Sequence, residues 1–249
     1  MIEVKNVSKS FGAQKVLNNI SLTVNPEEIV AVVGPSGVGK SVLLKLIMGI
    51  LQPDSGEILV AGKNITTARS EQERNEIRGV LGVLFQSAAL FDSLSVYENV
   101  VFPLEQHRNF SKQEKYNKVM EILEHLSLEK YVSRYPQELS IGIRKRIGMA
   151  RALVMEPKIF LFDEPNTGLD PIDGQEVYDL IKLCKDKWQF AGLVISHEIP
   201  EVFQVSDRVA MLLNGQIVEI DSPLNLQNSK NPAVCQFLKG DIDGPIQIQ

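Results

Sequence analysis

The strongest chemical signal in the sequence is a glycine-rich run with the spacing G-x-x-x-x-G-K-S, namely Gly34-Pro35-Ser36-Gly37-Val38-Gly39-Lys40-Ser41. Glycines in such a run let backbone amides curl around phosphate groups, and the N-terminus of a following helix adds partial positive charge. The Lys40 ammonium can reach terminal phosphates, and the Ser41 hydroxyl can bind Mg²⁺. The run therefore predicts a site for the phosphates of a nucleotide.

A pair of carboxylates, Asp163-Glu164, follows four apolar residues at 159–162. This pattern indicates the carboxyl end of a buried strand, where open α/β sheets bind ligands. Asp163 can hold Mg²⁺ through its water shell, and Glu164 can polarise an attacking water. General-base help of this kind is worth about 10²–10⁴-fold in rate. A phosphate loop alone does not choose between GTPases, kinases and ATPases. The guanine-reading motif Asn-Lys-x-Asp is absent, because Asn117-Lys118 is followed by Val119-Met120, so GTP is disfavoured.

The elements that must position these residues alternate between strands and helices. Residues 29–33 are apolar on both faces, as in a strand inside a parallel sheet, and a helix is expected from about Lys40 to Met48. Apolar strands are expected again at 159–162 and 193–195, which indicates a parallel α/β core.

Flanking segments complete this outline. The first 25 residues alternate as half-buried strands do, and further strands are expected at 57–60 and 80–85. Residues 86 to about 152 are predicted to be helical and to interrupt the core. Within them Ser111 and Glu114 have capping-box spacing, followed by an apolar face at helical spacing: Tyr116, Val119, Met120, Leu123 and Leu126. The polar stretch from Asp221 onward is predicted to be a C-terminal appendage.

Composition sets further bounds. The 249 residues suit one large domain or two small ones at ~150 residues each. The net charge of −5 lacks the basic footprint of nucleic-acid binders, and Arg144-Lys145-Arg146 is the one local basic cluster. Cys184 and Cys235 cannot form a disulfide framework and are expected to be buried, inert thiols. No signal peptide is visible, and the apolar stretch at 42–51 contains Lys45 and is too short to span a membrane.

With these motifs in place, nearly the whole chain resembles the nucleotide-binding domains of ABC transporters, and the motifs occur in that family's order. Phe11 is similar to the aromatic that stacks on adenine, and Gln86 to the Q-loop glutamine that senses Mg²⁺, water and the membrane partner. The signature motif of the family is matched by Leu139-Ser140-Ile141-Gly142-Ile143. Its D-loop is similar to Gly168-Leu169-Asp170, and its switch histidine to His197 within Ser196-His197-Glu198.

The resemblance implies an α/β fold with a P-loop NTPase (RecA-like) parallel-sheet core, an N-terminal antiparallel β part and an inserted helical subdomain. It implies one nucleotide-binding domain over 1–249, with core 1–85 and 155–221, helical subdomain 86–154 and C-terminal extension 222–249. Two ATP molecules with Mg²⁺ would be sandwiched in a head-to-tail homodimer. The implied roles are catalysis for Gln86, Glu164 and His197, nucleotide binding for Phe11, the run Gly34 to Ser41, Ser140, Gly142 and Asp170, and Mg²⁺ binding for Ser41, Gln86 and Asp163. Ser140 and Gly142 would serve the nucleotide of the other subunit.

The signature departs from the family pattern Leu-Ser-Gly-Gly at Ile141, and Ile143 replaces the usual Gln or Met. Glycine permits close backbone approach, whereas a β-branched residue is stiff. One hypothesis is that Ile141 slows or weakens closure of the dimer, and the other is that its side chain is turned harmlessly away.

Residues 84–100 are similar to the ATPases of Mla/Mce-type lipid-transport systems, as are Pro103-Leu104 and the stretches at 236–240 and 243–245. This resemblance implies an ATPase at the cytoplasmic face of the inner membrane, bound through residues 86–105 to a separate permease, with Mce-domain and STAS-domain proteins as further partners. It also implies that residues 222–249 reach across to clasp the dimer.

Three alternatives stay open at this point. The first is an ATPase for another solute, such as an amino acid or a drug, which would share the fold and the chemistry. The second is a soluble ABC protein outside transport, although such proteins usually carry two cassettes or a long inserted coiled coil. The third is a scaffold that binds nucleotide without hydrolysing it, which the unusual signature at Ile141 keeps open.

Overall fold

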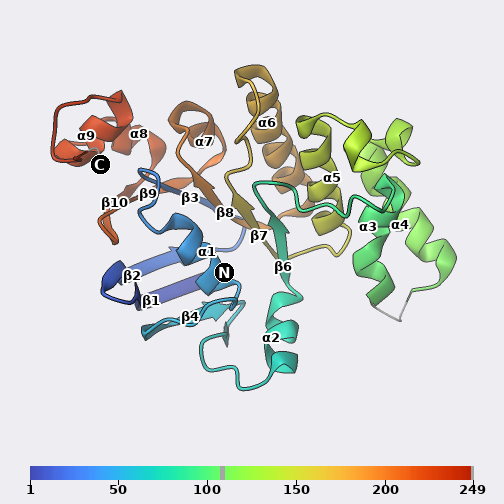
Figure 1. Ribbon diagram of the computed structural model, residues 1–249, viewed down its shortest axis with the longest axis horizontal. Helices are drawn as coiled ribbons and strands as arrows, with labels where there is room; N and C mark the ends of the chain where they lie inside the picture. Colours follow the sequence, from blue (N-terminus) through green and yellow to red (C-terminus); the bar gives the residue numbers. More distant parts are fainter. Residues whose placement is uncertain (107–109, 248–249) are drawn as a thin grey trace. The chain divides into compact units, whose positions relative to one another are not determined.

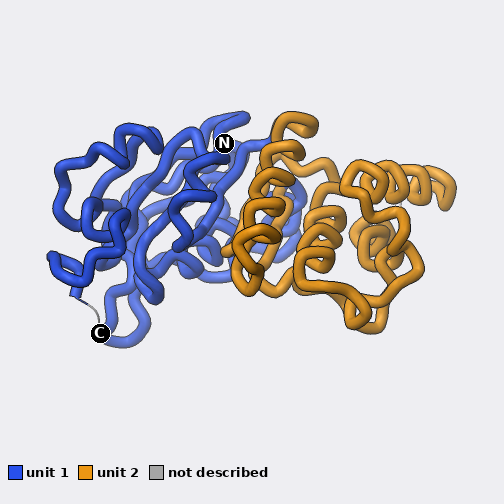
Figure 2. Tube along the Cα trace, turned by 90° about the horizontal axis from the view of Figure 1, so that it is seen from above, with its two compact units in different colours: residues 1–80, 190–249 blue, residues 81–189 orange. Residues whose placement is uncertain are grey.

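A computed structural model describes residues 1–106 and 110–247. The chain divides into two compact units (Figure 2). Unit 1 consists of Met1–Val80 and Phe190–Gln249, and unit 2 of Leu81–Gln189. Residues 107–109, inside the segment predicted to be helical, and 248–249, at the end of the predicted C-terminal extension, lie outside the described residues.

An antiparallel sheet forms the N-terminal part of unit 1 (Figure 1). Its strand order is β2-β1-β4-β5, with the bounds β1 Ile2–Phe11, β2 Gln14–Val24, β4 Ser55–Val60 and β5 Lys63–Asn64. Ile20, Leu22 and Val24 of β2 are buried while Ser21 and Thr23 between them are exposed. The strands predicted from alternation in the first 25 residues are therefore confirmed.

A second set of strands in unit 1 has the order β10-β9-β3-β8. Strand β3 (Ile29–Val33) pairs in parallel with β8 (Ala191–Ser196) and with β9 (Arg208–Leu213), and β10 (Gln216–Asp221) is antiparallel to β9. Every residue of β3 and of β8 is buried, as the apolar runs predicted. Hydrophobic burial on both faces thus fixes the strand that precedes the glycine-rich run.

In the described residues of unit 1 there are five helices: α1 Lys40–Ile47, α2 Glu71–Arg78, α7 Ile199–Val205, α8 Pro223–Gln227 and α9 Pro232–Lys239. Helix α1 contacts β4. Arg78 closes its C-terminus, because Nε donates to Met48 O (2.9 Å) and Nη2 to Gly49 O (3.0 Å). Carbonyls that a helix end leaves without partners are thereby satisfied by a cation, which also suits the helix dipole.

Unit 2, as far as the structure describes it, contains the parallel pair β6 (Leu81–Leu84) and β7 (Ile159–Asp163) together with four α-helices. The helices are α3 Val96–Gln106, α4 Lys112–His125, α5 Ile141–Leu153 and α6 Pro171–Trp188, and short 3₁₀ turns occupy Glu129–Tyr131 and Pro136–Glu138. Helix α5 is central, because it contacts β6, α3, α4 and α6.

The predicted capping box at the start of α4 is confirmed. Glu114 N donates to Ser111 Oγ (3.3 Å), and Ser111 N donates to Glu114 Oε2 (2.7 Å). The apolar face of this region is narrower than predicted. Its members Val119, Leu123 and Leu126 are buried, whereas Tyr116 is 49% exposed.

The prediction that the helical region begins at residue 86 is wrong, since residues 86–95 form a loop. Ala88 and Ala89 have φ of +60° and +47°, and Arg151 donates to their carbonyl oxygens at 3.0 and 2.8 Å. The fully buried Asn99 accepts a hydrogen bond from Phe91 N (2.9 Å). Its amide donates to three carbonyls of the same loop, those of Phe91, Leu94 and Ser95, at 3.1, 3.0 and 3.0 Å. These side chains satisfy the loop backbone in place of helical hydrogen bonds.

The two cysteines are free thiols in different surroundings. Cys184 is fully buried, as predicted, and burial raises the pKa of its thiol to about 12. Cys235 is only half-buried, so the prediction that it is buried is wrong. Among the helices in the described residues, none combines the length and the apolar character needed to cross a membrane.

Candidate nucleotide-hydrolysis site

The residues predicted to carry the chemistry are divided between the two units. Unit 1 contains Phe11, Gly34-Pro35-Ser36-Gly37-Val38-Gly39-Lys40-Ser41 and His197. Unit 2 contains Gln86, Ser140, Gly142, Asp163, Glu164 and Asp170.

The glycine-rich run of unit 1 forms a loop between β3 and α1 that only glycines permit. Gly34, Gly37 and Gly39 have φ of +149°, +80° and +107°, in the region that side chains disfavour. A Cβ on Gly34 would lie 2.1 Å from Leu212 O, and one on Gly39 would lie 2.9 Å from Val16 and Leu17 side-chain atoms. Gly39 is also the N-cap of α1, so the unpaired amides of the first helical turn face the loop.

Lys40 is the cation of this loop, and its side chain is 5% exposed. Its Nζ donates to Gly34 O (2.7 Å) and to Pro35 O (3.0 Å). The ammonium is thereby held within the curl of the loop, beside the backbone amides that would contact an anion. Beyond Gly37 there is open space, because a Cβ there would meet nothing within 4 Å. Concentrated donors with room beside them suit the phosphates of a nucleotide.

His197 lies near the same loop because of strand register. Val33 of β3 is paired with Ser196 of β8, so the loop that starts at Gly34 and the histidine leave adjacent parallel strands at the same edge. Glu198 N donates to Ser196 Oγ (3.0 Å), which tightens the turn at His197. Phe11 ends β1 and is 47% exposed, with the Lys9 ammonium 5.5 Å from its ring centroid.

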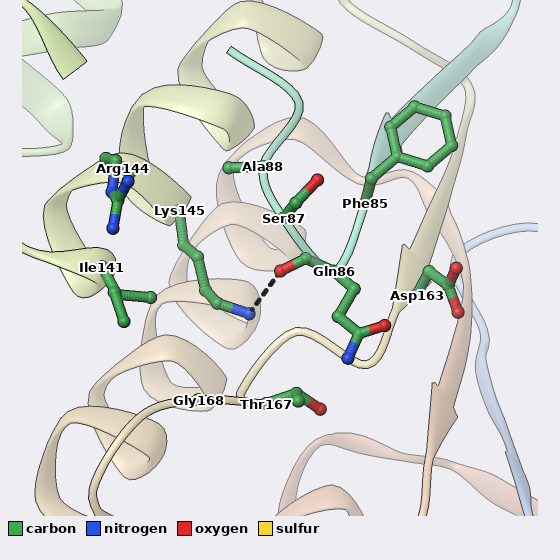
Figure 3. A pocket seen from close by; sticks show the side chains of 10 residues that line it. All are labelled: Phe85, Gln86, Ser87, Ala88, Ile141, Arg144, Lys145, Asp163, Thr167 and Gly168. Carbon is green, nitrogen blue, oxygen red and sulfur yellow. Dashed lines mark hydrogen bonds between the residues drawn. The ribbon is translucent and has the colours of Figure 1, made fainter. Parts of the chain in front are cut away.

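In unit 2, Gln86 and Asp163 are brought together in the same way. Leu84 of β6 is paired with Phe162 of β7, so both residues follow the carboxyl ends of neighbouring parallel strands. Both also line a cavity of about 530 Å³ (Figure 3). The cavity is bordered on its other sides by Ile141, Arg144, Lys145 and Thr167. Amide and carboxylate oxygens on one wall are ligands that suit Mg²⁺.

Glu164 is held in an unusual backbone conformation directly after β7. Its φ is +47°, which is uncommon for a residue other than glycine and concentrates at functional sites. Thr167 stabilises this turn twice, since its Oγ1 donates to Glu164 Oε2 (3.0 Å) and its N donates to Glu164 O (3.2 Å). Lys145 Nζ also donates to Glu164 O (3.4 Å). The carboxylate is therefore oriented by its neighbours, as a group that positions water must be.

The signature serine and the D-loop aspartate each begin a helix. Ser140 is the N-cap of α5, where its Oγ accepts from Ile143 N (3.4 Å). Asp170 is the N-cap of α6, where Oδ1 accepts from Ile172 N (2.9 Å) and Asp173 N (3.0 Å). Ile141 is 42% exposed and lines the cavity, whereas a Cβ on Gly142 would meet only Asp173 and Leu169 at 3.7 Å or more.

Two residues of this site, Lys145 and Thr167, were missed as functional candidates from the sequence. Lys145 was interpreted only as part of a basic cluster, yet it is 2% exposed. The available signal was its spacing of three and four residues before Gly148 and Met149, which are buried on the same helix. Thr167 gave no signal beyond lying three residues after Glu164.

Comparison with known proteins identifies the family to which this chain belongs. Residues 17–167 match the protein family described as "ABC transporter". The chain belongs to the ABC transporter family. This ABC protein is 37% identical over 249 residues to the "Intermembrane phospholipid transport system ATP-binding protein MlaF" of Haemophilus influenzae, covering all of this chain and 94% of that protein. It is 40% identical over 245 residues to the "Probable ribonucleotide transport ATP-binding protein mkl" of Mycobacterium leprae, covering 98% and 70% respectively.

Solved structures agree with this assignment. The ABC protein matches cbiO1 of Clostridium perfringens, part of the ABC transporter complex cbiONQ, with a TM-score of 0.85 and 28% identity, over 92% of this chain and 91% of that one. It also matches the dimeric post-hydrolysis state of the ATP-binding cassette MJ0796 bound to ADP and Pi, with a TM-score of 0.80 and 29% identity, over 90% and 99%. The predicted ABC fold class is confirmed, and the protein is an ATP-binding ATPase of a transport system.

Proposed function

We propose that this ABC ATPase powers the transport of a lipid through a separate membrane permease. The substrate class that we propose is phospholipids. The observation that carries the proposal is the alignment of all 249 residues with a phospholipid-transport ATPase at 37% identity. It is supported by the resemblance of residues 84–100 to lipid-transport ATPases. In the structure this segment includes an ordered loop, held by Asn99 and Arg151.

For the nucleotide, we propose that Phe11 stacks on adenine and that the loop from Gly34 to Ser41 contacts the phosphates. The positive φ of its glycines and the Lys40 ammonium within its curl support this role. His197 would contact the phosphate end, because it follows the strand next to the one that leads into the loop. The loop and the histidine would then bind and orient the phosphate chain.

For the metal, we propose Mg²⁺ with Ser41, Gln86 and Asp163 as its residues. All three supply oxygen atoms, which this ion prefers, and Gln86 and Asp163 line one cavity. The metal would neutralise phosphate charge when bound. Glu164 would accept a proton from the attacking water, with its carboxylate oriented by Thr167.

We propose a head-to-tail homodimer in which Ser140 and Gly142 of one protomer serve the nucleotide held by its partner. The dimeric structures of MJ0796, 29% identical to this chain, support this arrangement. The capped N-terminus of α5 supports it as well, because helix N-termini attract anions. Within the protomer, we propose the division into core 1–85 and 155–221, helical subdomain 86–154 and C-terminal extension 222–249, the last clasping the partner.

The proposed partners are an integral membrane permease, contacted through residues 86–105, together with Mce-domain and STAS-domain proteins. The proposed location is peripheral, at the cytoplasmic face of the inner membrane, and no nucleic-acid partner is proposed. A second candidate function is ribonucleotide transport. It is favoured by the 40% identity to the mycobacterial proteins named for that activity.

Purification of the tagged chain from its own membranes in mild detergent tests the proposal. A multi-span permease with an Mce-domain protein is the expected result. A permease with a solute-binding protein would move the function to a nutrient importer, and no membrane partner would favour a role outside transport.

The purified complex, reconstituted in vesicles, then separates the two substrates. Movement of a fluorescent phospholipid should depend on ATP and disappear with Glu164→Gln, while a labelled ribonucleotide should not move. ATP-dependent ribonucleotide movement without lipid movement would replace the first candidate with the second.

A further inference from the structure

One buried charge in unit 2, that of Lys145, has no task in the proposed function. Lys145 lies in α5 with only 2% of its surface exposed. Removing an ammonium from water is costly, so buried lysines keep their charge only where polar groups surround them. Lys145 Nζ donates to Gln86 O at 3.1 Å and to Glu164 O at 3.4 Å. Figure 3 shows the first of these bonds, which joins two residues that line the cavity.

The two acceptors belong to segments with different proposed tasks. Gln86 is in the loop that follows β6 and is the first residue of the segment 86–105 proposed to contact the permease. Glu164 is the proposed general base. Lys145 itself is four residues after Ile141, the first residue of α5. The signature serine that caps this helix, Ser140, is five residues before Lys145, which is about 7.5 Å along the helix axis.

We propose that Lys145 is a positioning residue that couples the Q-loop and the start of α5 to the backbone of Glu164. This proposal rests on the proposed role of Glu164 as general base. A single ammonium donating to two carbonyls fixes both at once, so a shift of the loop at Gln86 moves the donor on which Glu164 depends.

The contact from Lys145 matters because the backbone of Glu164 has an unusual conformation. The residue has φ of +47°, a conformation that persists only where surrounding contacts enforce it. Thr167 holds it from within the same turn, and Lys145 holds it from another element of the unit. Replacing Lys145 removes a contact to Glu164 O that comes from outside this turn, so the position of the carboxylate relative to the Q-loop should be less well defined.

The test compares Lys145→Met with Lys182→Met in the full-length chain. Lys182 is exposed on α6, so its substitution controls for the loss of one lysine from the same unit. Lys145→Met should lower kcat for ATP by about 100-fold, the scale of a misplaced catalytic group. KM and the affinity for a fluorescent ATP analogue should stay within about threefold, because the phosphate loop is untouched. A loss in nucleotide affinity with kcat unchanged overturns the proposal.

A double-mutant cycle separates coupling from a general structural effect. If Lys145 acts through the carboxylate, Lys145→Met should lower the residual turnover of Glu164→Gln by less than about twofold, since the effects are not additive. An equal fold-loss in both backgrounds overturns the proposal. Full turnover of Glu164→Gln by itself would instead refute the proposed general base, which is a distinct outcome.

Graded variants cover the case in which Lys145→Met does not fold. Lys145→Arg keeps a cation with several donors, and Lys145→Gln keeps a neutral donor. Turnover should fall in the order Lys, Arg, Gln, with thermal midpoints of the folded variants close to that of the parent. A positioning role is contradicted if the turnover of the variants correlates with their thermal midpoints and not with the hydrogen-bond donors that they keep at position 145.

Discussion

The phosphate loop of unit 1 and the cavity of unit 2 hold their functional groups in different ways. In unit 1, Gly34 to Lys40 are consecutive, and the loop shapes itself through its own backbone, with Lys40 bonded to carbonyls five and six residues away. In unit 2, the groups come from separate segments. Side chains far away in sequence, Arg151 and Lys145, join them through bonds that span about 60 residues.

The difference predicts which substitutions disrupt the phosphate loop and which disrupt the cavity. A loop built from its own backbone fails when a glycine gains a side chain, because the conformation itself is lost. A cavity assembled by long-range side-chain contacts fails when one of those contacts is removed, even though every loop keeps its own sequence. The two regions should therefore respond to different substitutions.

The largest expected effect separates chemistry in unit 2 from binding in unit 1. Glu164→Gln should lower ATP turnover by about 10²–10⁴-fold, because it removes the general base. ATP binding should persist, since the Gly34 to Ser41 loop is unchanged. A phosphate-release assay measures turnover, and titration with a fluorescent ATP analogue measures binding. An unchanged turnover rate would show that Glu164 is not the general base.

The next effect concerns the backbone of the phosphate loop. Gly34→Ala should destabilise unit 1 by more than about 3 kcal/mol, since strain at positive φ adds to a Cβ lying 2.1 Å from Leu212 O. Gly37→Ala is the matched control, with strain of roughly 1–2 kcal/mol and no neighbour within 4 Å. Denaturant unfolding of both variants measures the difference, and equal losses would show that the close approach does not matter.

A smaller effect is expected where unit 2 depends on a buried amide. Asn99→Ala removes the side-chain partner of Phe91 N and of three loop carbonyls, two of which also accept from backbone N–H groups. It should cost about 2–3 kcal/mol of folding free energy. Asn117→Ala, which removes one exposed hydrogen bond to Gln113, should change stability by less than about 0.5 kcal/mol. Hydrogen exchange of residues 86–95 reports the loosening directly, and protection equal to that of the parent would contradict this role for Asn99.

The smallest effect tests the departure in the signature. Ile141 is exposed on the cavity wall, so Ile141→Gly should change stability by no more than about 1 kcal/mol. It should raise ATP turnover a few-fold if the stiff side chain slows dimer closure, whereas rates equal to the parent would favour the side chain turned harmlessly away. Steady-state turnover at saturating ATP is the measurement.

The same contrast explains how far sequence reasoning reached. The strand at 29–33, the phosphate loop and the capping box at Ser111 are local patterns, so spacing alone predicted them. The loop at 86–95 was predicted to be helical because nothing in its own sequence marked it as a loop. Its stabilisation depends on the side chains of Asn99 and Arg151, which lie outside the loop and leave no periodic signal in it. Lys145 was missed for a related reason, since a lysine is ordinarily assigned to the surface, and only the packing of α5 shows it to be buried.

The unlike surroundings of the two thiols have a practical consequence. With its pKa raised to about 12, Cys184 stays protonated and shielded near neutral pH, and it is the thiolate that reacts with maleimides. Cys235, half-buried in α9, is the thiol left to react. The unmodified sequence thus offers a single attachment point for a fluorophore or spin label, in helix α9, without any cysteine having to be removed.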